Sequence, residues 1–359
     1  MPTPERPIIL ATRGSPLALA QSTSVLAQCR NAYPNLSFEI KIIKTTGDKL
    51  QTASMAQGSP GLPKGLFTKE LETALLNGEA DMAVHSLKDL PTELPDGLVL
   101  GAVGLRADVR DVLIYRQRPG SADGVHTAAI GTISAPDDQS SRRGFGPNLR
   151  TSDLPNAATI ATSSTRRREQ LLERRPDLQI VEVRGNVGTR LQKLANTAMI
   201  DATILAAAGL ARLGYRVSDK GELFCDPAAL AANPKLAIPA GLLAVFLPTD
   251  EMVPCVGQGA VGIEVRANDS RIAGVCQRLD HAPTRHCVTA ERAFLLAMGG
   301  GCQSPVAAYA EASGEDLVLR AVSYRSGTAR RSTVRGCTSE AQILGKQLAG
   351  ELSDGNPQG

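Results

Sequence analysis

Aromatic residues are scarce in this sequence. The 359-residue chain has no tryptophan, and aromatic residues make up only 3% of it. Hydrophobic residues still reach 42%, so a sizeable core is expected, built from leucine, valine, isoleucine and alanine. Proteins that bind nucleic acid combine a strongly basic domain with aromatic stacking, whereas 39 basic and 36 acidic residues give a net charge of +3 here. Nucleic acid is therefore not an expected partner, and any anion binding must come from local clusters of charge.

Paired metal-binding or disulfide motifs are also missing. The seven cysteines form no C-x-x-C pair and their number is odd, so neither a disulfide framework nor a structural zinc site is expected. The four histidines show no H-x-x-x-H or H-E-x-x-H spacing, so we expect no metal site.

Long hydrophobic runs are absent as well. No stretch is long and apolar enough to span a bilayer. Met1–Arg6 is short, carries both signs of charge and lacks the apolar core of a signal peptide and the composition of a transit peptide. These features predict a cytoplasmic protein without a membrane partner.

The elements that are present alternate between strand and helix patterns, which predicts α/β sheets covered on both faces. Residues 7–12 form an apolar strand pattern, and a helix follows over 17–30, with Ser15 as N-cap and Pro16 at its first position. Three globular units fit the pattern, one before about residue 105, one from about 108 to 253 and one from about 278 to the end. The other expected strands are 38–43, 81–85, 111–115, 158–161, 178–183, 201–206 and 257–266, and the other expected helices are 67–77, 164–174, 187–195 and 284–298, before a meander over 306–335 and a helix over 339–352.

The stretch Gly299–Pro305 joins a helix stop to a lone cysteine. Three glycines end the helix and free the backbone for positive φ, so Cys302 is expected on a turn that a large ligand can reach. The alternative is a small buried cysteine beside a helix end, because free cysteine is among the most buried residue types.

Three strand-to-helix junctions each combine arginine with hydroxyls, glycines or free amides, namely 11–15, 162–167 and 184–190. Arg166 and Arg167 lie in the first turn of a helix, where the helix dipole disfavours cations. An anionic ligand would compensate for this repulsion, and guanidinium groups are suited to carboxylates. The alternative is that these arginines lie on a solvated face, but three such junctions together favour anion binding at the carboxyl ends of the strands.

Two further features need separate interpretation. Asp89 lies just past a strand, where it could stabilise a cationic intermediate or cap its own turn. Gly257–Gly262 matches G-x-G-x-x-G, but it leads into a strand, whereas a dinucleotide-binding fingerprint must open a helix. We therefore expect these glycines to mark a chain crossing between domains.

Seven blocks, in order along nearly the whole chain, resemble the porphobilinogen deaminase family, also called hydroxymethylbilane synthase. They are Ala11–Leu19, Lys64–Leu71, Val84–Pro91, Arg184–Arg190, Leu205–Gly214, Val256–Ala260 and Gly300–Gln303. Seven ordered blocks are a far more specific signal than any one of them.

The resemblance implies three α/β domains, the first two similar to the lobes of periplasmic binding proteins. We expect domain 1 over 1–107 plus about 255–277, and domain 2 over 108–254 with insertions at about 117–157 and 226–250. The third, smaller α/β domain covers 278–359 and carries Cys302. The implied reaction adds four porphobilinogen units to a dipyrromethane cofactor, releasing ammonia and then hydroxymethylbilane by hydrolysis, in tetrapyrrole (heme) biosynthesis by a monomeric transferase. Uroporphyrinogen-III synthase is a possible downstream partner.

The resemblance also assigns roles to residues of this chain. Cys302 would hold the cofactor through a thioether, and Asp89 would be the essential catalytic carboxylate, which also contacts the cofactor. The other implied cofactor-binding residues are Lys64, Lys88, Ser164, Arg166, Arg167, Arg184 and Gly185, and the implied substrate-binding residues are Arg13, Ser15, Gln21, Arg190 and Arg212.

Two rival interpretations remain at this point. The first two domains alone would suit a two-lobed carboxylate-binding protein without catalysis, and Cys302 alone would suit a cysteine-nucleophile acyl transferase. A covalently held pyrrole on Cys302 would exclude both.

Overall fold

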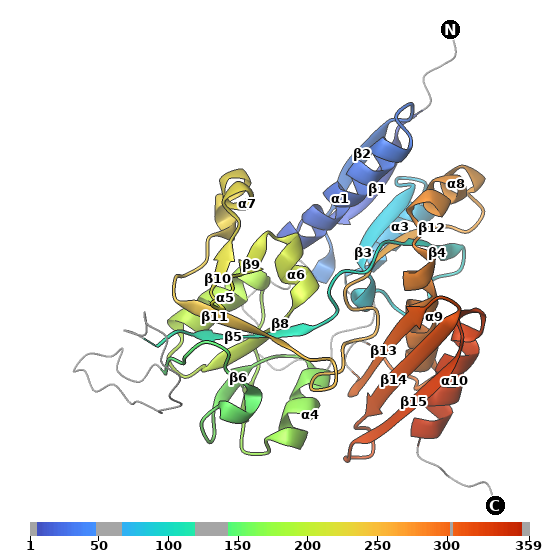
Figure 1. The fold of residues 1–359 in the computed structure, drawn as a ribbon. Coiled ribbons are helices and arrows are strands. Elements are labelled where there is room, and N and C mark those ends of the chain that lie inside the picture. Colours follow the sequence, from blue (N-terminus) through green and yellow to red (C-terminus); the bar gives the residue numbers. More distant parts are fainter. Residues whose placement is uncertain (1–5, 48–66, 119–142, 302–303, 354–359) are drawn as a thin grey trace, which may run out of the picture. The chain divides into compact units, whose positions relative to one another are not determined.

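The computed structural model describes residues 6–47, 67–118, 143–301 and 304–353 (Figure 1). Contacts divide the chain into two compact units, Met1–Ala107 with Pro254–Gly359, and Asp108–Val253. Lys64 and Cys302, both expected to contact the cofactor, lie outside the described residues.

A five-stranded sheet forms the centre of the first unit, in the order β2-β1-β3-β12-β4. Strand β1 pairs in parallel with β2 and β3, whereas β12 is antiparallel to β3 and β4. Their bounds are β1 Ile8–Arg13, β2 Phe38–Ile43, β3 Met82–Ser86, β4 Leu98–Val103 and β12 Val261–Arg266. The glycine-rich segment before β12 leads into a strand and not into a helix, so the rejection of the dinucleotide-binding motif is confirmed.

Helices cover both faces of this sheet. Helix α1 (Pro16–Ala32) buries Ala18, Val25 and Cys29 at helical spacing, and it shares one apolar cluster with α8 (Ser270–Leu279). Helix α3 (Lys69–Leu76) belongs to a separate cluster with other residues of β1 and β3. The predicted N-cap is confirmed, because Ser15 Oγ accepts a hydrogen bond of 3.3 Å from the Ala18 amide. Strand β4 and helix α8 were not predicted; each contains a glycine, which weakens the pattern of a strand or a helix.

The end of the chain forms a small α/β layer within the same unit. Strands β13 (Val306–Ser313), β14 (Asp316–Ser323) and β15 (Arg330–Cys337) make the expected antiparallel meander. Helices α9 (Ala282–Ala297) and α10 (Ala341–Leu352) pack against each other and share one core with the sheet (Figure 1). Helix α9 ends just before Gly299, whose φ of 60° confirms the predicted glycine stop.

The close approach of α9 and α10 depends on Gly345. A Cβ placed at Gly345 would lie 2.3 Å from the Ala290 carbonyl oxygen and 2.7 Å from the Ala293 Cβ. We therefore expect Gly345→Ala to destabilise the protein by about 1–3 kcal/mol, the usual cost of overpacking, as measured by denaturant unfolding. Gly350→Ala on the same helix is the matched control, because a Cβ there meets nothing within 4 Å. Equal stability of the two variants would contradict the prediction.

The second unit has its own five-stranded sheet, in the order β11-β5-β8-β6-β7. Strand β6 pairs in parallel with β7 and β8, and β5 is antiparallel to both β8 and β11. The strands are β5 Asp111–Arg116, β6 Thr159–Ala161, β7 Gln179–Val181, β8 Ala202–Ala206 and β11 Leu242–Leu247, with a small hairpin of β9 Tyr215–Val217 and β10 Leu223–Cys225. The helices are α4 Thr165–Arg174, α5 Val187–Asn196, α6 Ala207–Arg212 and α7 Pro227–Ala232.

The structure bears on part of the two insertions expected in the second unit, of which residues 119–142 lie outside the described residues. The segment 226–250 supplies β11, an edge strand of the central sheet, whose apolar run is preceded by proline- and glycine-rich sequence that concealed it. Of the segment 117–157, the described part packs into the core: Phe145, Leu149 and Leu154 are buried, and the Phe145 ring contacts Tyr115 edge-to-face at 6.0 Å. These apolar residues stand alone in a polar sequence, so they form no periodic pattern from which their burial could be predicted.

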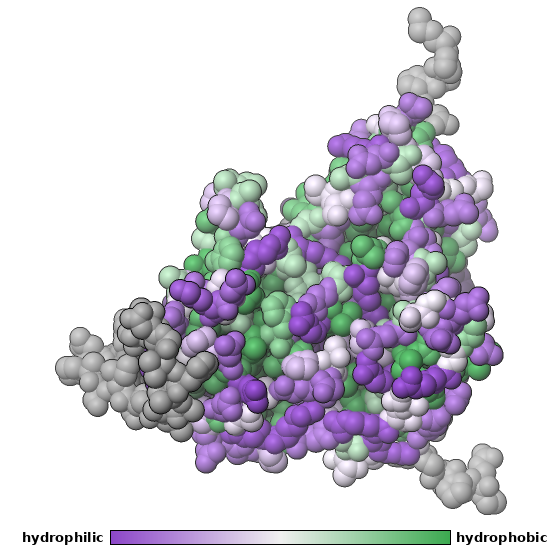
Figure 2. All heavy atoms as spheres, viewed as in Figure 1, coloured by the Kyte–Doolittle hydropathy of each residue, from purple (hydrophilic) through white to green (hydrophobic). Residues whose placement is uncertain are grey.

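Hydrophilic side chains cover most of the face seen in Figure 2, with hydrophobic residues in patches between them. Within the described ranges, no helix has the length and apolar character needed to cross a membrane. The same part of the chain contains no group of three or more histidine, cysteine or acidic residues able to hold a metal ion.

Candidate active site

Asp89 is presented by a short turn at the carboxyl end of β3. The turn Leu87–Asp89 is a single 3₁₀ turn, anchored by the buried Leu87 side chain and by a hydrogen bond of 3.1 Å from the Leu87 amide to the Ala260 carbonyl. The Asp89 side chain is exposed. Among the described residues, its carboxylate forms no hydrogen bond or ion pair, so capping of its own turn does not occupy it. The turn thus holds an available negative charge at a fixed place.

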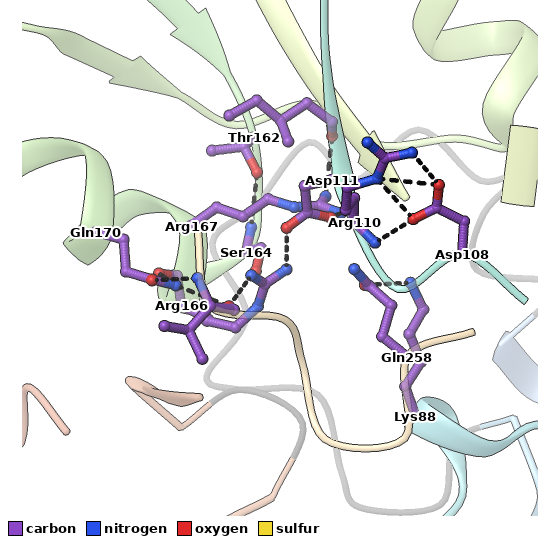
Figure 3. Close-up of polar contacts among 12 residues, drawn as sticks. Lys88, Asp108, Arg110, Asp111, Thr162, Ser164, Arg166, Arg167, Gln170 and Gln258 are labelled. Carbon is purple, nitrogen blue, oxygen red and sulfur yellow. Dashed lines mark hydrogen bonds and ion pairs between the residues drawn. The ribbon is translucent and has the colours of Figure 1, made fainter. Parts of the chain in front are cut away.

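Two polar contacts brace this turn. The Gln21 amide, buried on α1, lies 3.0 Å from the Ser86 hydroxyl at the start of the turn. The Lys88 ammonium donates to the Gln258 side chain at 3.5 Å (Figure 3). Gln21, expected to bind substrate directly, is therefore placed to orient Ser86.

Arg13 and Ser15 end the neighbouring strand and begin α1. Because β1 and β3 are parallel, both strands end at the same edge of the sheet. The chain passes from β1 to β2 on one side and later to β3 on the other, so this edge is a topological switch point, where α/β sheets bind ligands. The Arg13 guanidinium stacks 4.2 Å from the Phe67 ring centroid. The structure thus brings Arg13, Ser15, Gln21, Lys88 and Asp89 to one edge of one sheet.

The second unit repeats this design. Strands β6, β7 and β8 are parallel, and each is followed by a helix, so their carboxyl ends share one edge with the switch point between β6 and β8. The predicted residues at that edge are Ser164 and the two following arginines after β6, Arg184, Gly185 and Arg190 after β7, and Arg212 at the end of α6. Burial lowers the pKa of Arg212.

Arg166 and Arg167 face inward and not toward solvent. Both are buried, and their guanidinium groups bind the two carboxylate oxygens of Asp111 at 2.8 and 2.6 Å (Figure 3). Arg166 also donates to the Val253 carbonyl and Arg167 to the Ile204 carbonyl. A carboxylate of the protein itself, that of Asp111, therefore compensates for the cations in the first turn of α4. Solvated arginines are ruled out at this junction.

Asp111 is the residue that the sequence reasoning missed. Burial alone raises the pKa of Asp111, but the positive charges of Arg166 and Arg167 outweigh this and hold the pKa well below its ordinary value. Two guanidinium groups share one carboxylate, which leaves a surplus of positive charge at the α4 N-terminus. The buried Nε atoms of both arginines have no hydrogen-bond partner among the described residues. An aspartate at the first position of a largely apolar strand was the signal available in the sequence.

The junction after β7 is more open. Arg184 is exposed, and among the described residues its one ion pair is with the exposed Glu182, at 3.3 Å. Gly185 has a φ of 115°, and a Cβ there would lie 2.7 Å from Thr189, so only glycine fits. Asn186 caps α5 by accepting a bond from the Thr189 amide, and Arg190 Nε donates to the Gly185 carbonyl at 2.9 Å. This loop offers a guanidinium and a helix N-terminus to an anion.

Gly301 and Ser304, on either side of the two residues that the structure does not describe, are joined by two hydrogen bonds. The Gly301 amide donates to Ser304 Oγ at 3.0 Å, and the Ser304 amide donates to the Gly301 carbonyl at 3.0 Å.

The six cysteines within the described ranges are free, and three of them, Cys29, Cys276 and Cys287, are buried. Burial raises the pKa of each of these three thiols to about 11 or 12, so they are unsuited to act as nucleophiles.

Comparison with known proteins decides the family. A model described as "Porphobilinogen deaminase, dipyromethane cofactor binding domain" matches residues 8–274, and one described as "Porphobilinogen deaminase, C-terminal domain" matches residues 285–354. The chain belongs to the porphobilinogen deaminase family. The porphobilinogen deaminase of Desulforudis audaxviator is 42% identical over 97% of this chain and 94% of the relative. That of Syntrophus aciditrophicus is 38% identical over 96% and 95%.

Two solved structures are distantly similar to this chain. The periplasmic VFT2 domain of Bordetella pertussis BvgS is 14% identical, with a TM-score of 0.35 over 76% of this chain and 86% of that one. The BenM effector binding domain with benzoate is 15% identical, with a TM-score of 0.37 over 77% and 91%. The family assignment therefore comes from the sequence relation, which favours a porphobilinogen deaminase, a transferase with a dipyrromethane cofactor, over a binding protein without catalysis.

The described residues fit a dipyrromethane. Such a group carries several carboxylates and pyrrole N–H donors. The second unit offers the surplus positive charge of Arg166 and Arg167, the exposed Arg184 and the α5 N-terminus, all suited to carboxylates. The first unit offers the carboxylate of Asp89, which has no partner in the described ranges and suits N–H donors.

Proposed function

We propose that this protein is a hydroxymethylbilane synthase that condenses four porphobilinogen molecules in succession, releasing ammonia at each addition and linear hydroxymethylbilane at the end by hydrolysis. Its close relatives over nearly the whole chain support this activity. The single observation that supports the placement of the chemistry is Asp89, an exposed carboxylate without a protein partner among the described residues, at the end of a central parallel strand.

Asp89 is the proposed catalytic residue. Loss of ammonia from porphobilinogen leaves a methylene-pyrrolenine, and positive charge develops on its ring. A carboxylate that no cation of the described residues neutralises can stabilise this charge and accept hydrogen bonds from pyrrole N–H groups. Because buried Leu87 fixes the turn, the carboxylate needs little reorganisation when the charge develops.

The basic residues at the two sheet edges are proposed to bind acetate and propionate groups. Each charge-assisted hydrogen bond of this kind contributes about 1.5–3 kcal/mol. We assign Arg13, Ser15, Arg190 and Arg212 to the substrate, and Lys64, Lys88, Ser164, Arg184 and Gly185 to the cofactor. We assign Gln21 an indirect role through Ser86. Arg166 and Arg167 would act on the cofactor through the surplus positive charge that remains when both bind Asp111.

Cys302 is proposed to anchor the cofactor through a thioether. When bound, the dipyrromethane supplies the free pyrrole carbon to which the first substrate unit is joined. An anchoring thiol must be accessible to the cofactor, but it needs no general base beside it. A position directly after three glycines, whose backbone is conformationally free, provides this access. We further propose that the enzyme acts as a cytoplasmic monomer, and that its product passes to a uroporphyrinogen-III synthase.

Intact mass spectrometry tests this function. We expect purified protein to carry the added mass of two linked pyrrole units, and Cys302→Ser to lack it. Cys337→Ser, at another free cysteine, is the matched control and should keep the added mass. If wild-type protein incubated with porphobilinogen neither gains mass nor releases ammonia, the proposal is wrong.

A further inference from the structure

Helix α9 holds the loop that follows Asp89. The Arg292 guanidinium donates to three consecutive carbonyls, those of Leu90 at 3.2 Å, Pro91 at 2.6 Å and Thr92 at 3.3 Å. These partners lie 200–202 residues before Arg292 in the sequence. The guanidinium group is planar and its N–H donors have fixed directions, so it can bind these three carbonyls only in one loop conformation.

Arg292 differs from other buried or partly buried arginines of the first unit. Arg106 pairs with Glu291, Arg266 with Asp81 and Arg285 with Asp280. Arg292 forms no such ion pair within the part of the chain that the structure describes, and burial lowers its pKa to about 10. Its guanidinium instead donates three hydrogen bonds to the backbone of one loop. We infer that this buried charge is retained because it holds the shape of that loop.

The turn is thereby fixed from both sides. On the upstream side, the Leu87 amide is bonded to the Ala260 carbonyl, and Ser86 contacts Gln21. On the downstream side, Pro91 has no amide hydrogen to donate, so the loop relies on its carbonyls for anchoring. Asp89 lies between these two anchors with an exposed carboxylate that touches neither.

We propose that Arg292 is a positioning residue that fixes the Asp89 carboxylate for reaction by clamping the carbonyls of Leu90, Pro91 and Thr92. This inference rests on the proposed role of Asp89 and extends it to a residue outside the sheet edge. Helix α9 ends at Ala297, just before the glycines that precede Cys302, so the clamp also ties the proposed catalytic turn to the helix that leads to the proposed anchor.

Steady-state kinetics of Arg292→Gln test the proposal against a matched control. Arg285→Gln removes an arginine from the same helix that also donates to carbonyls, those of Leu100 and Gly101, away from the Asp89 turn. Since a shift of about 1 Å in a catalytic group can cost about a hundredfold in rate, we expect kcat of Arg292→Gln to fall about ten- to a hundredfold below that of Arg285→Gln. KM should stay within about twofold, because Arg292 contacts no proposed substrate-binding group. A kcat within twofold of the control would overturn the proposal.

Two further variants separate positioning from simple loss of stability. Arg292→Lys keeps the charge but not the fork, so it should recover only part of the rate while unfolding at a temperature close to that of the wild type. In single-turnover assays of ammonia release, Asp89→Asn with Arg292→Gln should be no slower than Asp89→Asn alone, because a misplaced group that is already disabled costs nothing further. Multiplicative losses would contradict positioning through Asp89. Failure of the proposed function itself is distinguishable, because wild-type protein would then release no ammonia.

Discussion

Asp89→Asn is expected to lower kcat by about 10²–10³-fold, the usual loss when one group aimed at a developing charge is removed. The amide has nearly the same shape but no negative charge, so it cannot balance the positive charge of the pyrrolenine. Because the Asp89 carboxylate has no protein partner among the described residues, the substitution should leave folding unchanged. Rates of ammonia release and thermal unfolding of the same preparation check both expectations.

The control for this prediction is Asp96→Asn. Asp96 is another exposed aspartate of the same unit, seven residues further along the chain, and its substitution should leave kcat near the wild-type value. Intact mass should show that Asp89→Asn keeps its covalent cofactor, so that a slow rate is not mistaken for a missing primer. If Asp89→Asn keeps a kcat within a few-fold of the wild type, Asp89 is not the catalytic carboxylate.

Asp111→Asn is expected to destabilise the second unit by about 3–5 kcal/mol. The substitution leaves the buried guanidinium groups of Arg166 and Arg167 without their counter-charge, and breaking a buried ion pair from one side costs about this much. Urea unfolding followed by circular dichroism measures the change. The matched control is Asp108→Asn, which removes a partly exposed pair with Arg110 and should cost less than about 1 kcal/mol. Equal losses in the two variants would contradict the prediction.

The same carboxylate predicts a dependence of stability on pH. The pKa of Asp111 in the folded protein lies well below its ordinary value of 3.8. Its contribution to stability is therefore complete above about pH 4 and is lost as the pH falls further toward the folded pKa. Wild-type protein should lose more stability than Asp111→Asn between pH 4 and pH 2. Parallel losses in the two proteins would show that Asp111 is not the group responsible.

Features encoded by neighbouring residues could be predicted from the sequence. Ser15 and Pro16 predicted the start of α1, and the glycines from Gly299 predicted the end of α9, because helix caps and helix stops depend on a few adjacent residues. The β13–β15 meander followed from alternation of side chains. Strand β11 and the burial of Phe145 were missed, since isolated or glycine-flanked apolar residues carry little periodic signal.

In the candidate site, too, some features could be predicted from the sequence and others could not. By itself, the sequence determined the α/β class, the family, and the loops at strand ends where Asp89, Arg13 and Arg184 lie. Only the tertiary structure decided the partners: Asp111 as counter-charge to Arg166 and Arg167, and the Asp89 loop as the acceptor for Arg292. The physical reason is that turns and caps depend on local backbone geometry, whereas a buried charge selects its partner from whatever packing brings within hydrogen-bond distance, here across 55 to 202 residues of chain.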